Sequence, residues 1–382
     1  MSTDKLFEKI EELYPKYVKV WEDVCKIESP THHKAGVDAV GRYFIDMAEE
    51  KGWQVEVSEQ AVSGNAVCIT INPESTEAPV CFSGHMDTVH PIGLFPDPIV
   101  TMDETNIYGP GVNDCKGGCV ASFLALDALA QTGYKKRPVK LILQSDEETS
   151  SKESDKKTVE FMCEKAKDAV AFFNAEGHSK GEITMQRKGI LRFCLTVTGK
   201  AVHSAKCYEG VSAIAEAAHK LIELESMKDP NGLTCNCGVI GGGTVANTVA
   251  ESCSFEADIR FSNSEEEREA RRRVKEVAQK TWLAGCTCEV KEVSYRPAME
   301  YSEKNYALLD KMNEIYTQVG LPTLKPVIRN GGSDTAFTTQ AGIPCVDSIG
   351  VAGDGIHSLK EYAELKSLIL SAQYLASATM YL

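Results

Sequence analysis

The sequence lacks the long apolar stretches of a membrane protein and the paired cysteine motifs of a disulfide scaffold or zinc finger. No run of apolar residues reaches the ~18 residues that a membrane-spanning helix requires. From Met1 to Pro30 the pattern is charged and amphipathic, unlike a secretory signal. Fourteen cysteines are present, but several lie inside apolar runs and none forms a CxxC pair. We therefore expect free thiols, a reducing cytoplasmic location and no membrane partner.

Positively charged residues are fewer than negatively charged ones. Lys and Arg number 41 against 55 Asp and Glu, which leaves a net charge of −14. A field of that sign repels phosphate backbones, so we expect no nucleic-acid partner. Hydrophobic residues make up 43% and charged residues 25% of the 382 residues, a composition that excludes a disordered chain and fits two globular domains.

Helical and strand patterns alternate at both ends of the chain, which is typical of an α/β core. The middle section instead predicts the order strand, helix, strand, strand, helix, strand, which is that of a ferredoxin-like α+β domain. The sequence therefore predicts one α/β domain built from residues 1–187 and 298–382, interrupted by an inserted domain over residues 188–297.

Titratable side chains gather where buried strands are predicted to end. His85 and Asp87 follow the strand over residues 80–83, and Glu147 and Glu148 follow another buried strand. Ligands of an α/β sheet bind at the carboxyl ends of its strands. His85 and Asp87 are two residues apart in extended chain, so their side chains point the same way. A carboxylate in that position can fix the tautomer of a metal-binding imidazole.

Three further donors complete a candidate metal site. Asp114 lies in the glycine-rich turn over 109–118, whose spacing matches neither a P-loop nor a dinucleotide fingerprint. Glu176 follows another strand, and His357 lies in a late loop. The set has two histidines and three carboxylates as possible ligands, and one further carboxylate remains. One metal ion would use three of these ligands and a water molecule. Two ions ~3.5–4 Å apart would use all five, with one carboxylate bridging them. The spare glutamate would then serve as a general base.

Five segments occur in the order found in a dinuclear zinc family of peptidases and amidohydrolases: Ser83–Val89, Gly109–Gly118, Asp146–Glu148, Ala175–Gly177 and Gly355–His357. Over essentially its whole length, the chain resembles this family, which includes bacterial glutamate carboxypeptidase, acetylornithine deacetylase, succinyl-diaminopimelate desuccinylase and tripeptidase (peptidase T). The segments at 330–336 and 349–357 are most similar to the glutamate carboxypeptidase branch. The resemblance implies a zinc-peptidase-like three-layer catalytic domain with an inserted ferredoxin-like dimerisation (lid) domain.

The resemblance also implies two divalent metal ions per chain, zinc first, with cobalt or manganese as alternatives. His85, Asp114 and Glu176 would hold one ion. Asp114, Glu148 and His357 would hold the other, so that Asp114 bridges the pair. The peptide bond that follows Asp114 is expected to be cis.

Three more residues receive roles from the resemblance. Glu147 would be the general base, and Asp87 would orient His85. His203 of the inserted domain would reach the active site of the partner subunit in a homodimer and donate to the oxyanion. Cys115 departs from the relatives, which often carry Asp, Asn or Met there, and its thiol is expected to point away from the metals.

The relatives hydrolyse an amide whose amine side is an amino acid with a free carboxylate. An arginine fork matches a carboxylate with two hydrogen bonds. The candidate substrate-binding residues are Asn247, Arg260, Arg329, Gly331, Gly332 and Ser333. The leading interpretation is a metal-dependent hydrolase of a dipeptide or N-acyl amino acid. Its alternatives are a tripeptide aminopeptidase, an N-acetyl or N-succinyl deacylase and, last, a catalytically silent metal-stabilised binding protein.

Overall fold

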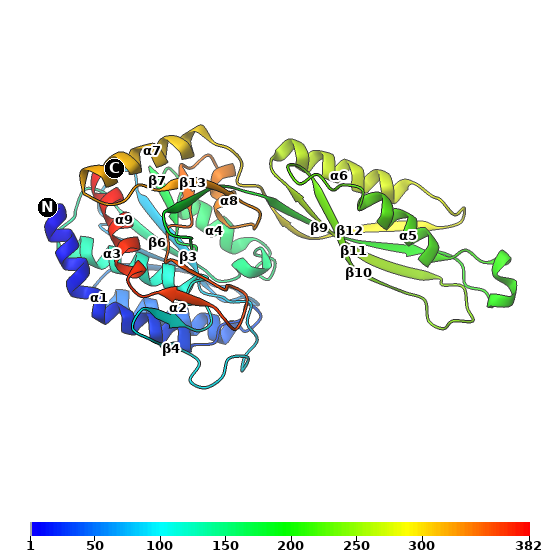
Figure 1. Ribbon diagram of the computed structural model, residues 1–382, viewed down its shortest axis with the longest axis horizontal. Helices are drawn as coiled ribbons and strands as arrows, with labels where there is room; N and C mark the ends of the chain where they lie inside the picture. The colour runs from blue at the N-terminus through cyan, green and yellow to red at the C-terminus, as the bar shows by residue number, and fades with distance from the viewer. Residues whose placement is uncertain (1) are drawn as a thin grey trace. The chain divides into compact units, whose positions relative to one another are not determined.

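The computed structural model describes residues 2–382, which divide into two compact units (Figure 1). The first comprises Met1–Met185, Tyr301–Ile328 and Phe337–Leu382, and the second comprises Gln186–Glu300 and Arg329–Ala336. The sequence placed all of residues 298–382 in the first domain, whereas the short segment Arg329–Ala336 groups with the second unit. Each unit is described by itself below.

An eight-stranded sheet forms the centre of the first unit, in the order β1-β2-β6-β3-β7-β14-β8-β13. β3 pairs in parallel with both β6 and β7, and β14 pairs in parallel with β7. The outer pairs β1–β2 and β2–β6 are antiparallel. The strands are β1 (Gln54–Ser58), β2 (Ala66–Ile71), β3 (Val80–His85), β6 (Val139–Gln144), β7 (Ala171–Asn174), β8 (Glu182–Arg187), β13 (Lys325–Arg329) and β14 (Cys345–Asp347).

Helices cover both faces of this sheet. A Cβ atom on Gly84 of β3 would meet the Cys119 thiol of α3, so α3 lies on that face. On the opposite face, the Ser83 hydroxyl of β3 lies 3.8 Å from the Met162 sulfur of α4. The three-layer α/β/α arrangement that the family resemblance implies is therefore confirmed. The helices are α1 (Thr3–Lys26), α2 (Lys34–Glu50), α3 (Lys116–Gln131), α4 (Lys157–Lys165), α7 (Glu303–Gln318), α8 (Thr335–Gln340) and α9 (Ser367–Tyr381).

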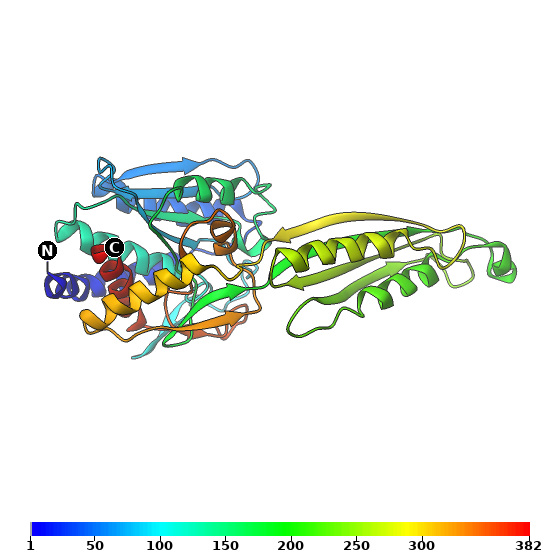
Figure 2. The same cartoon turned by 90° about the horizontal axis from the view of Figure 1, so that it is seen from above.

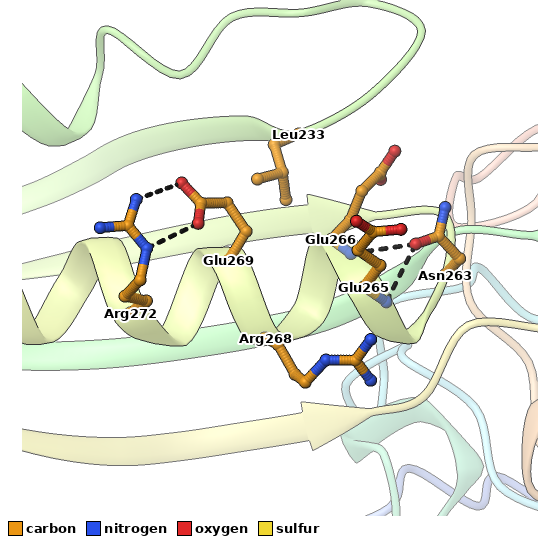
Figure 3. Close-up of a pocket in the computed structure, with 7 residues that line it drawn as sticks. All are labelled: Leu233, Asn263, Glu265, Glu266, Arg268, Glu269 and Arg272. Atoms are coloured by element: carbon orange, nitrogen blue, oxygen red, sulfur yellow. Dashed lines mark hydrogen bonds and ion pairs between the residues drawn. The ribbon is translucent and has the colours of Figure 1, made fainter.

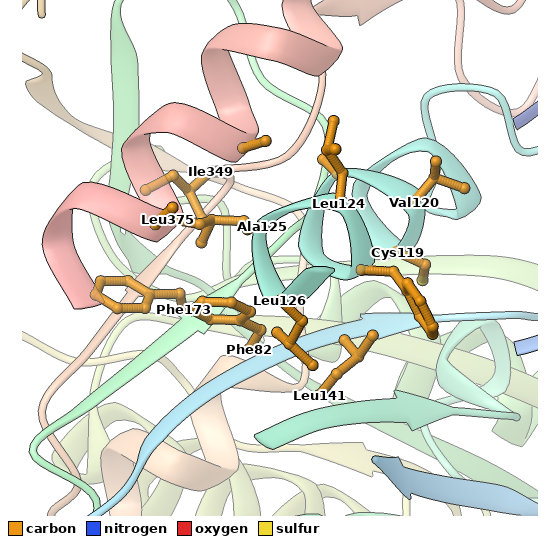
Figure 4. Packing of buried hydrophobic residues seen from close by; sticks show 14 of the residues in the cluster. Phe82, Cys119, Val120, Leu124, Ala125, Leu126, Leu141, Phe173, Ile349 and Leu375 are labelled. Carbon is orange, nitrogen blue, oxygen red and sulfur yellow. The ribbon is translucent and has the colours of Figure 1, made fainter. Parts of the chain in front are cut away.

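The centre of the hydrophobic core is α3, which is apolar on nearly all sides. Leu124 and Leu126 are fully buried, and α3 packs against α1 and α9 as well as against the sheet. Figure 4 shows Phe82 and Phe173 of the strands beneath this helix and Leu375 of α9 beside it. A helix without a polar face is stable only when it is enclosed in this way. The core therefore fixes the start of α3, where the glycine-rich turn ends.

A second, small sheet in the first unit has the order β15-β16-β5-β4. Its strands are β4 (Thr101–Met102), β5 (Asn106–Tyr108), β15 (Gly353–Asp354) and β16 (Tyr362–Glu364). β16 pairs antiparallel with β5, with Tyr362 opposite Tyr108. This pairing brings the loop that carries His357 next to the glycine-rich turn, although the two are far apart in sequence.

The second unit has the predicted ferredoxin-like order. Its elements are β9 (Gly189–Thr198), α5 (Ala213–Leu224), β10 (Thr234–Gly242), β11 (Ser252–Phe261), α6 (Ser264–Gln279) and β12 (Thr287–Arg296). The sheet order is β10-β11-β9-β12, and every neighbouring pair is antiparallel. Leu191, Phe193 and Leu195 alternate on the buried side of β9, and α5 and α6 lie together on one face of the sheet (Figure 2). A period of two residues is what a half-buried strand requires.

Several short elements were not predicted. The strands β4, β5, β15 and β16 have two or three residues each, too few to carry a periodic pattern. All fourteen cysteines are free thiols. Among the described residues, no helix has both the length and the apolar character needed to cross a membrane.

The close approach of α3 to the end of β7 gives a stability prediction. A Cβ atom on Gly118 would stand 1.7 Å from the carbonyl oxygen of Ala175, so Gly118→Ala should lower the unfolding free energy by about 1–3 kcal/mol or prevent folding. Gly41 of α2 is the matched control, because its added Cβ would lie 3.4 Å from the Met86 sulfur, an ordinary contact. Gly41→Ala should be neutral or stabilise by up to about 1 kcal/mol. Thermal and denaturant unfolding measure both variants, and equal losses would contradict this account.

Candidate metal centre

Three neighbouring parallel strands of the first unit end at the same edge of the sheet and deliver acidic and imidazole groups there. His85 is the last residue of β3. Glu147 and Glu148 begin the short 3₁₀ turn just after β6. Glu176 follows β7 by two residues. Because β6, β3 and β7 are adjacent and parallel, their carboxyl ends converge, as the sequence interpretation required.

Asp114 lies at the centre of this group and presents one oxygen to each histidine. His85 Nε2 lies 3.0 Å from Asp114 Oδ1 and 3.7 Å from Glu176 Oε1. His357 Nε2 lies 3.2 Å from Asp114 Oδ2 and 3.3 Å from Glu148 Oε2. The structure thus brings together all five predicted ligands in two sets that share one carboxylate. Distances of this size are those between ligand atoms arranged around a common metal ion.

The electrostatics of the group favour added positive charge. Burial, with the charge of Asp114, raises the pKa of Glu148 to about 8, and burial also raises the pKa of Glu176 well above its usual value. Hydrogen bonds to Asp114 and Glu148 raise the pKa of His357 to about 10. Burial opposes ionisation of Asp114, but its bonds to His357 and His85 outweigh it and lower the pKa of this carboxyl. Carboxylate and imidazole donors crowded in this way fit divalent zinc, cobalt or manganese.

Asp87 orders the neighbouring ligands from a fully buried position. Its Oδ1 lies 3.3 Å from His85 Nδ1, and its own carbonyl oxygen lies closer to that nitrogen, at 3.0 Å. The carboxylate also accepts the backbone N–H groups of Glu147 and Glu148, both at 3.2 Å, and the Thr31 hydroxyl at 2.7 Å. Asp87 therefore contacts the imidazole through both its carboxylate and its carbonyl oxygen, and its carboxylate also holds the start of the acidic turn.

Glu147 is a buried carboxylate next to the five predicted metal ligands, and it was predicted as a general base and not as a ligand. Its charge contributes, after burial and Asp114, to the raised pKa of Glu148, and it also contributes to that of Glu176. It is therefore close to both sets of donors. A carboxylate in this place is available to exchange protons with a small molecule bound next to it.

Cys115 does not point away from the site, so that expectation is wrong. Its Sγ and ligand atoms of His85 and Glu176 all lie within 4.8 Å of one another. The thiol donates to the carbonyl oxygen of Ala175 at 3.2 Å, and burial raises its pKa well above the ordinary value. The expected cis peptide bond between Asp114 and Cys115 is present.

Two of the predicted substrate-side residues lie together in the second unit. His203 is exposed and caps a short 3₁₀ helix over Ser204–Glu209, where its Nδ1 accepts the N–H of Ala205 at 3.2 Å. The N–H of Ser204 donates to the carbonyl oxygen of Asn247 at 2.9 Å. His203 and Asn247 therefore belong to one loop cluster, although 44 positions separate them in the sequence numbering.

Arg260 lies on the face of the second unit's sheet that is turned away from α5 and α6. Its Nε donates to Asp258 Oδ1 at 2.6 Å, and Arg192 of the neighbouring strand donates to Asp258 Oδ2 at 2.8 Å. Asp258 thus holds two guanidinium groups side by side. Glu256 of the same strand lines the same hollow as these three residues, so two carboxylates lie near the two arginines.

The last four predicted residues share one segment of the second unit. Arg329 ends β13, and Gly331, Gly332 and Ser333 follow it. A Cβ atom on Gly332 would come within 2.9 Å of the Arg296 side chain, so the backbone packs closely here. Ser333 is fully buried.

Sequence reasoning missed one buried acid, Glu361. Its carboxylate accepts backbone N–H groups from the glycine-rich turn that contains Asp114, and it also bonds to His90. The only sequence signal was its position, four residues after His357.

The charged face of α6 forms a separate, open hollow of about 650 Å³ (Figure 3). Asn263 caps the helix by accepting the N–H groups of Glu265 and Glu266, and Arg272 pairs with Glu269 at 2.6 Å. Because these groups satisfy one another along the helix, the hollow needs no ligand.

Comparison with known proteins identifies the family. The sequence model of peptidase family M20/M25/M40 matches residues 81–381, and the chain belongs to this family. Carboxypeptidase G2 from Pseudomonas sp. (strain RS-16) is 28% identical over 371 residues, which cover 95% of this chain and 88% of that protein. The protein is therefore a hydrolase of the metallopeptidase type.

Two solved structures illustrate the shared fold. A tripeptidase from Staphylococcus aureus superposes with a TM-score of 0.78 at 21% identity and covers 96% of this chain and 98% of its own. A dinuclear metal binding peptidase of the M20 family from Bacillus subtilis has a TM-score of 0.69 at 17% identity, covering 97% and 98%. At these identities the likeness establishes the fold alone.

The geometry predicts how metal binding responds to substitution. We expect two divalent ions per chain at saturation, because Asp114 presents one oxygen to each histidine set. Asp114→Ala should weaken both sites, whereas His357→Ala should remove one. His178→Ala is the control, since this buried histidine lies outside both sets and its Nδ1 contacts the Ser179 carbonyl oxygen at 2.8 Å. Equilibrium dialysis with metal analysis measures the stoichiometry, and one ion per wild-type chain would contradict the bridged arrangement.

Proposed function

We propose that the protein uses two divalent metal ions, bridged by Asp114, to hydrolyse the amide bond of a dipeptide or N-acyl amino acid with a free carboxylate. The single observation that supports this most is the arrangement of His85 and His357 on opposite oxygens of one buried carboxylate. Zinc is the first candidate metal, with cobalt or manganese as alternatives, because the donors are imidazole and carboxylate groups. The Bacillus subtilis relative described as a dinuclear metal binding peptidase supports the number of ions.

The roles of the chain's own residues follow from their positions. When bound, divalent ions polarise the scissile carbonyl and lower the pKa of a water molecule. Glu147 accepts the proton of the attacking water and returns it to the leaving amine. Asp87 keeps His85 in the tautomer whose Nε2 is free to bind metal, and its bonds to the backbone of Glu147 and Glu148 hold both side chains at the site.

Substrate recognition is proposed for the second unit. The arginine pair at Asp258 and the segment that begins at Arg329 offer groups that suit a carboxylate. The similarity to carboxypeptidase G2 favours a carboxypeptidase over the alternatives, which are a tripeptide aminopeptidase and an N-acetyl or N-succinyl amino acid deacylase. A catalytically silent binding protein ranks last, because Glu147 is present. The free thiols of all fourteen cysteines favour a reducing compartment such as the cytoplasm.

A hydrolysis screen tests the reaction. We expect the zinc-, cobalt- or manganese-loaded enzyme to release a free amino acid from N-acyl or dipeptidyl substrates that end in a carboxylate. Glu147→Gln should keep both metals and the fold but lose about two to four orders of magnitude in turnover, the usual contribution of a positioned base. Amide analogues of the terminal carboxylate are the matched control substrates. Near-normal turnover by Glu147→Gln would refute its role, and cleavage of the amide analogues alone would favour a different substrate class.

We also propose that the active unit is a homodimer joined through residues of about 188–297, in which His203 donates to the oxyanion in the partner's active site. The exposure of His203 and its place beside Asn247, outside the metal-binding unit, support this assignment. Loss of one oxyanion donor costs ~100–1,000-fold in turnover.

Mixing two inactive variants tests action across the interface. His203→Ala and Glu147→Gln should each be nearly inactive while binding metal normally. In a mixed dimer, one site then lacks both groups and the other has both, so part of the activity should return. The readout is turnover after verified subunit exchange. If His203 serves its own chain, every site stays defective and no recovery occurs.

A further inference from the structure

The glycine-rich turn before α3 contains backbone N–H groups that its own fold leaves without backbone partners. The turn is buried, and Gly109 and Gly111 adopt positive φ angles of 152° and 73°. Successive N–H groups in such a turn face one side and form a concave anion-binding nest. Because buried backbone N–H groups are almost always hydrogen-bonded, some other group must accept the hydrogen bonds of this turn.

The acceptor is the side chain of Glu361. Its Oε1 accepts the N–H of Asn113 at 2.9 Å and that of Asp114 at 3.0 Å. Its Oε2 accepts the N–H of Gly111 at 3.1 Å and lies 3.1 Å from His90 Nε2. The carboxylate is 1% exposed, and hydrogen bonds to a charged acceptor are stronger than neutral ones. The nest is therefore filled by a carboxylate from the chain itself.

Glu361 also belongs to the loop that carries the other end of the metal site. It lies four residues after His357, and its backbone carbonyl accepts the N–H of Gly109 at 3.3 Å. The β16–β5 pairing holds the same two segments together. One residue thus joins the backbone of Asp114 to the loop of His357. In the metal site, Asp114 Oδ2 and His357 Nε2 lie 3.2 Å apart.

We propose that Glu361 is a positioning residue of the metal centre: it fixes the backbone of Asp114 and couples it to the His357 loop, so that both are preorganised for metal binding. This inference rests on the proposed metal-dependent function. Glu361 touches neither histidine ligand nor the reacting groups, and it acts through the main chain of Asp114.

Metal affinity of the folded protein tests the proposal. Outer partners of metal ligands typically contribute 10–100-fold in affinity, so Glu361→Ala should bind Zn²⁺ about 10–100-fold more weakly in competition with a chelator. Glu361→Gln should show a smaller loss, because the amide oxygen can still accept from Asn113 and Asp114 while its NH₂ group faces the N–H of Gly111. Should Glu361→Ala fail to fold, Glu361→Gln and Glu361→Asp carry the test.

Asp127→Asn is the matched control. Asp127 is a buried carboxylate of the same unit that also accepts from several donors, namely the Tyr17 hydroxyl at 2.7 Å, Lys51 at 2.8 Å and Gln131 at 2.9 Å. It lies outside the metal site, so its substitution should lower the melting temperature of the metal-free protein without weakening Zn²⁺ binding.

The outcomes separate this inference from the proposed function. If wild-type protein binds no metal, the proposed function fails. If wild type binds two ions and Glu361→Ala or its conservative substitutes bind them as tightly, the positioning role is overturned. An equal loss of affinity in Asp127→Asn would also overturn it, because the effect would then reflect general destabilisation.

Discussion

Repulsion among buried carboxylates is the interaction on which the rest of this structure depends. Three parallel strands and one turn bring Asp114, Glu148 and Glu176 together, largely buried, at one edge of the sheet, with Glu147 beside them. Burial raises the pKa of Glu148 and Glu176 because ionised carboxylates lose their hydration there. Two histidines alone compensate this charge incompletely, and divalent cations would complete it. The surrounding fold has to hold these groups together against their mutual repulsion.

Two other buried carboxylates help to hold the ligands in place against that repulsion. They accept hydrogen bonds from the backbone and bind no cation in the proposed arrangement. Asp87 accepts the N–H groups at the start of the acidic turn, and Glu361 accepts those of the glycine-rich turn. Each carboxylate thereby satisfies buried donors and fixes the main chain of a ligand. The ligand side chains are then left with few alternative positions. The same arrangement explains why glycines are needed in the turn, since only a residue without Cβ readily takes the φ of Gly111.

The second unit shows a different use of charge. The open face of its sheet carries Arg192 and Arg260 beside Asp258, with Glu256 in the same hollow, while its helices carry internal acid–base pairs. Along the helix, acidic and basic side chains neutralise one another, so these pairs do not require a bound ligand. The two guanidinium groups on the sheet face are of the kind that can bind a carboxylate with two hydrogen bonds each.

The sequence by itself determined the alternating α/β pattern, the ferredoxin-like order of the second unit and the five metal-binding candidates, because strand ends and hydrophobic periods are local properties. Tertiary structure decided what depends on distant partners. The strands of two or three residues exist only because a neighbour pairs with them. The Cys115 thiol faces the site because the packing of α3 against β3 and Ala175 places it there. In the sequence, no pattern distinguishes Glu361 from the other acidic residues. Its role arises because β16 pairs with β5 and carries it to N–H groups about 250 residues earlier in the chain, a contact between segments that no local pattern encodes.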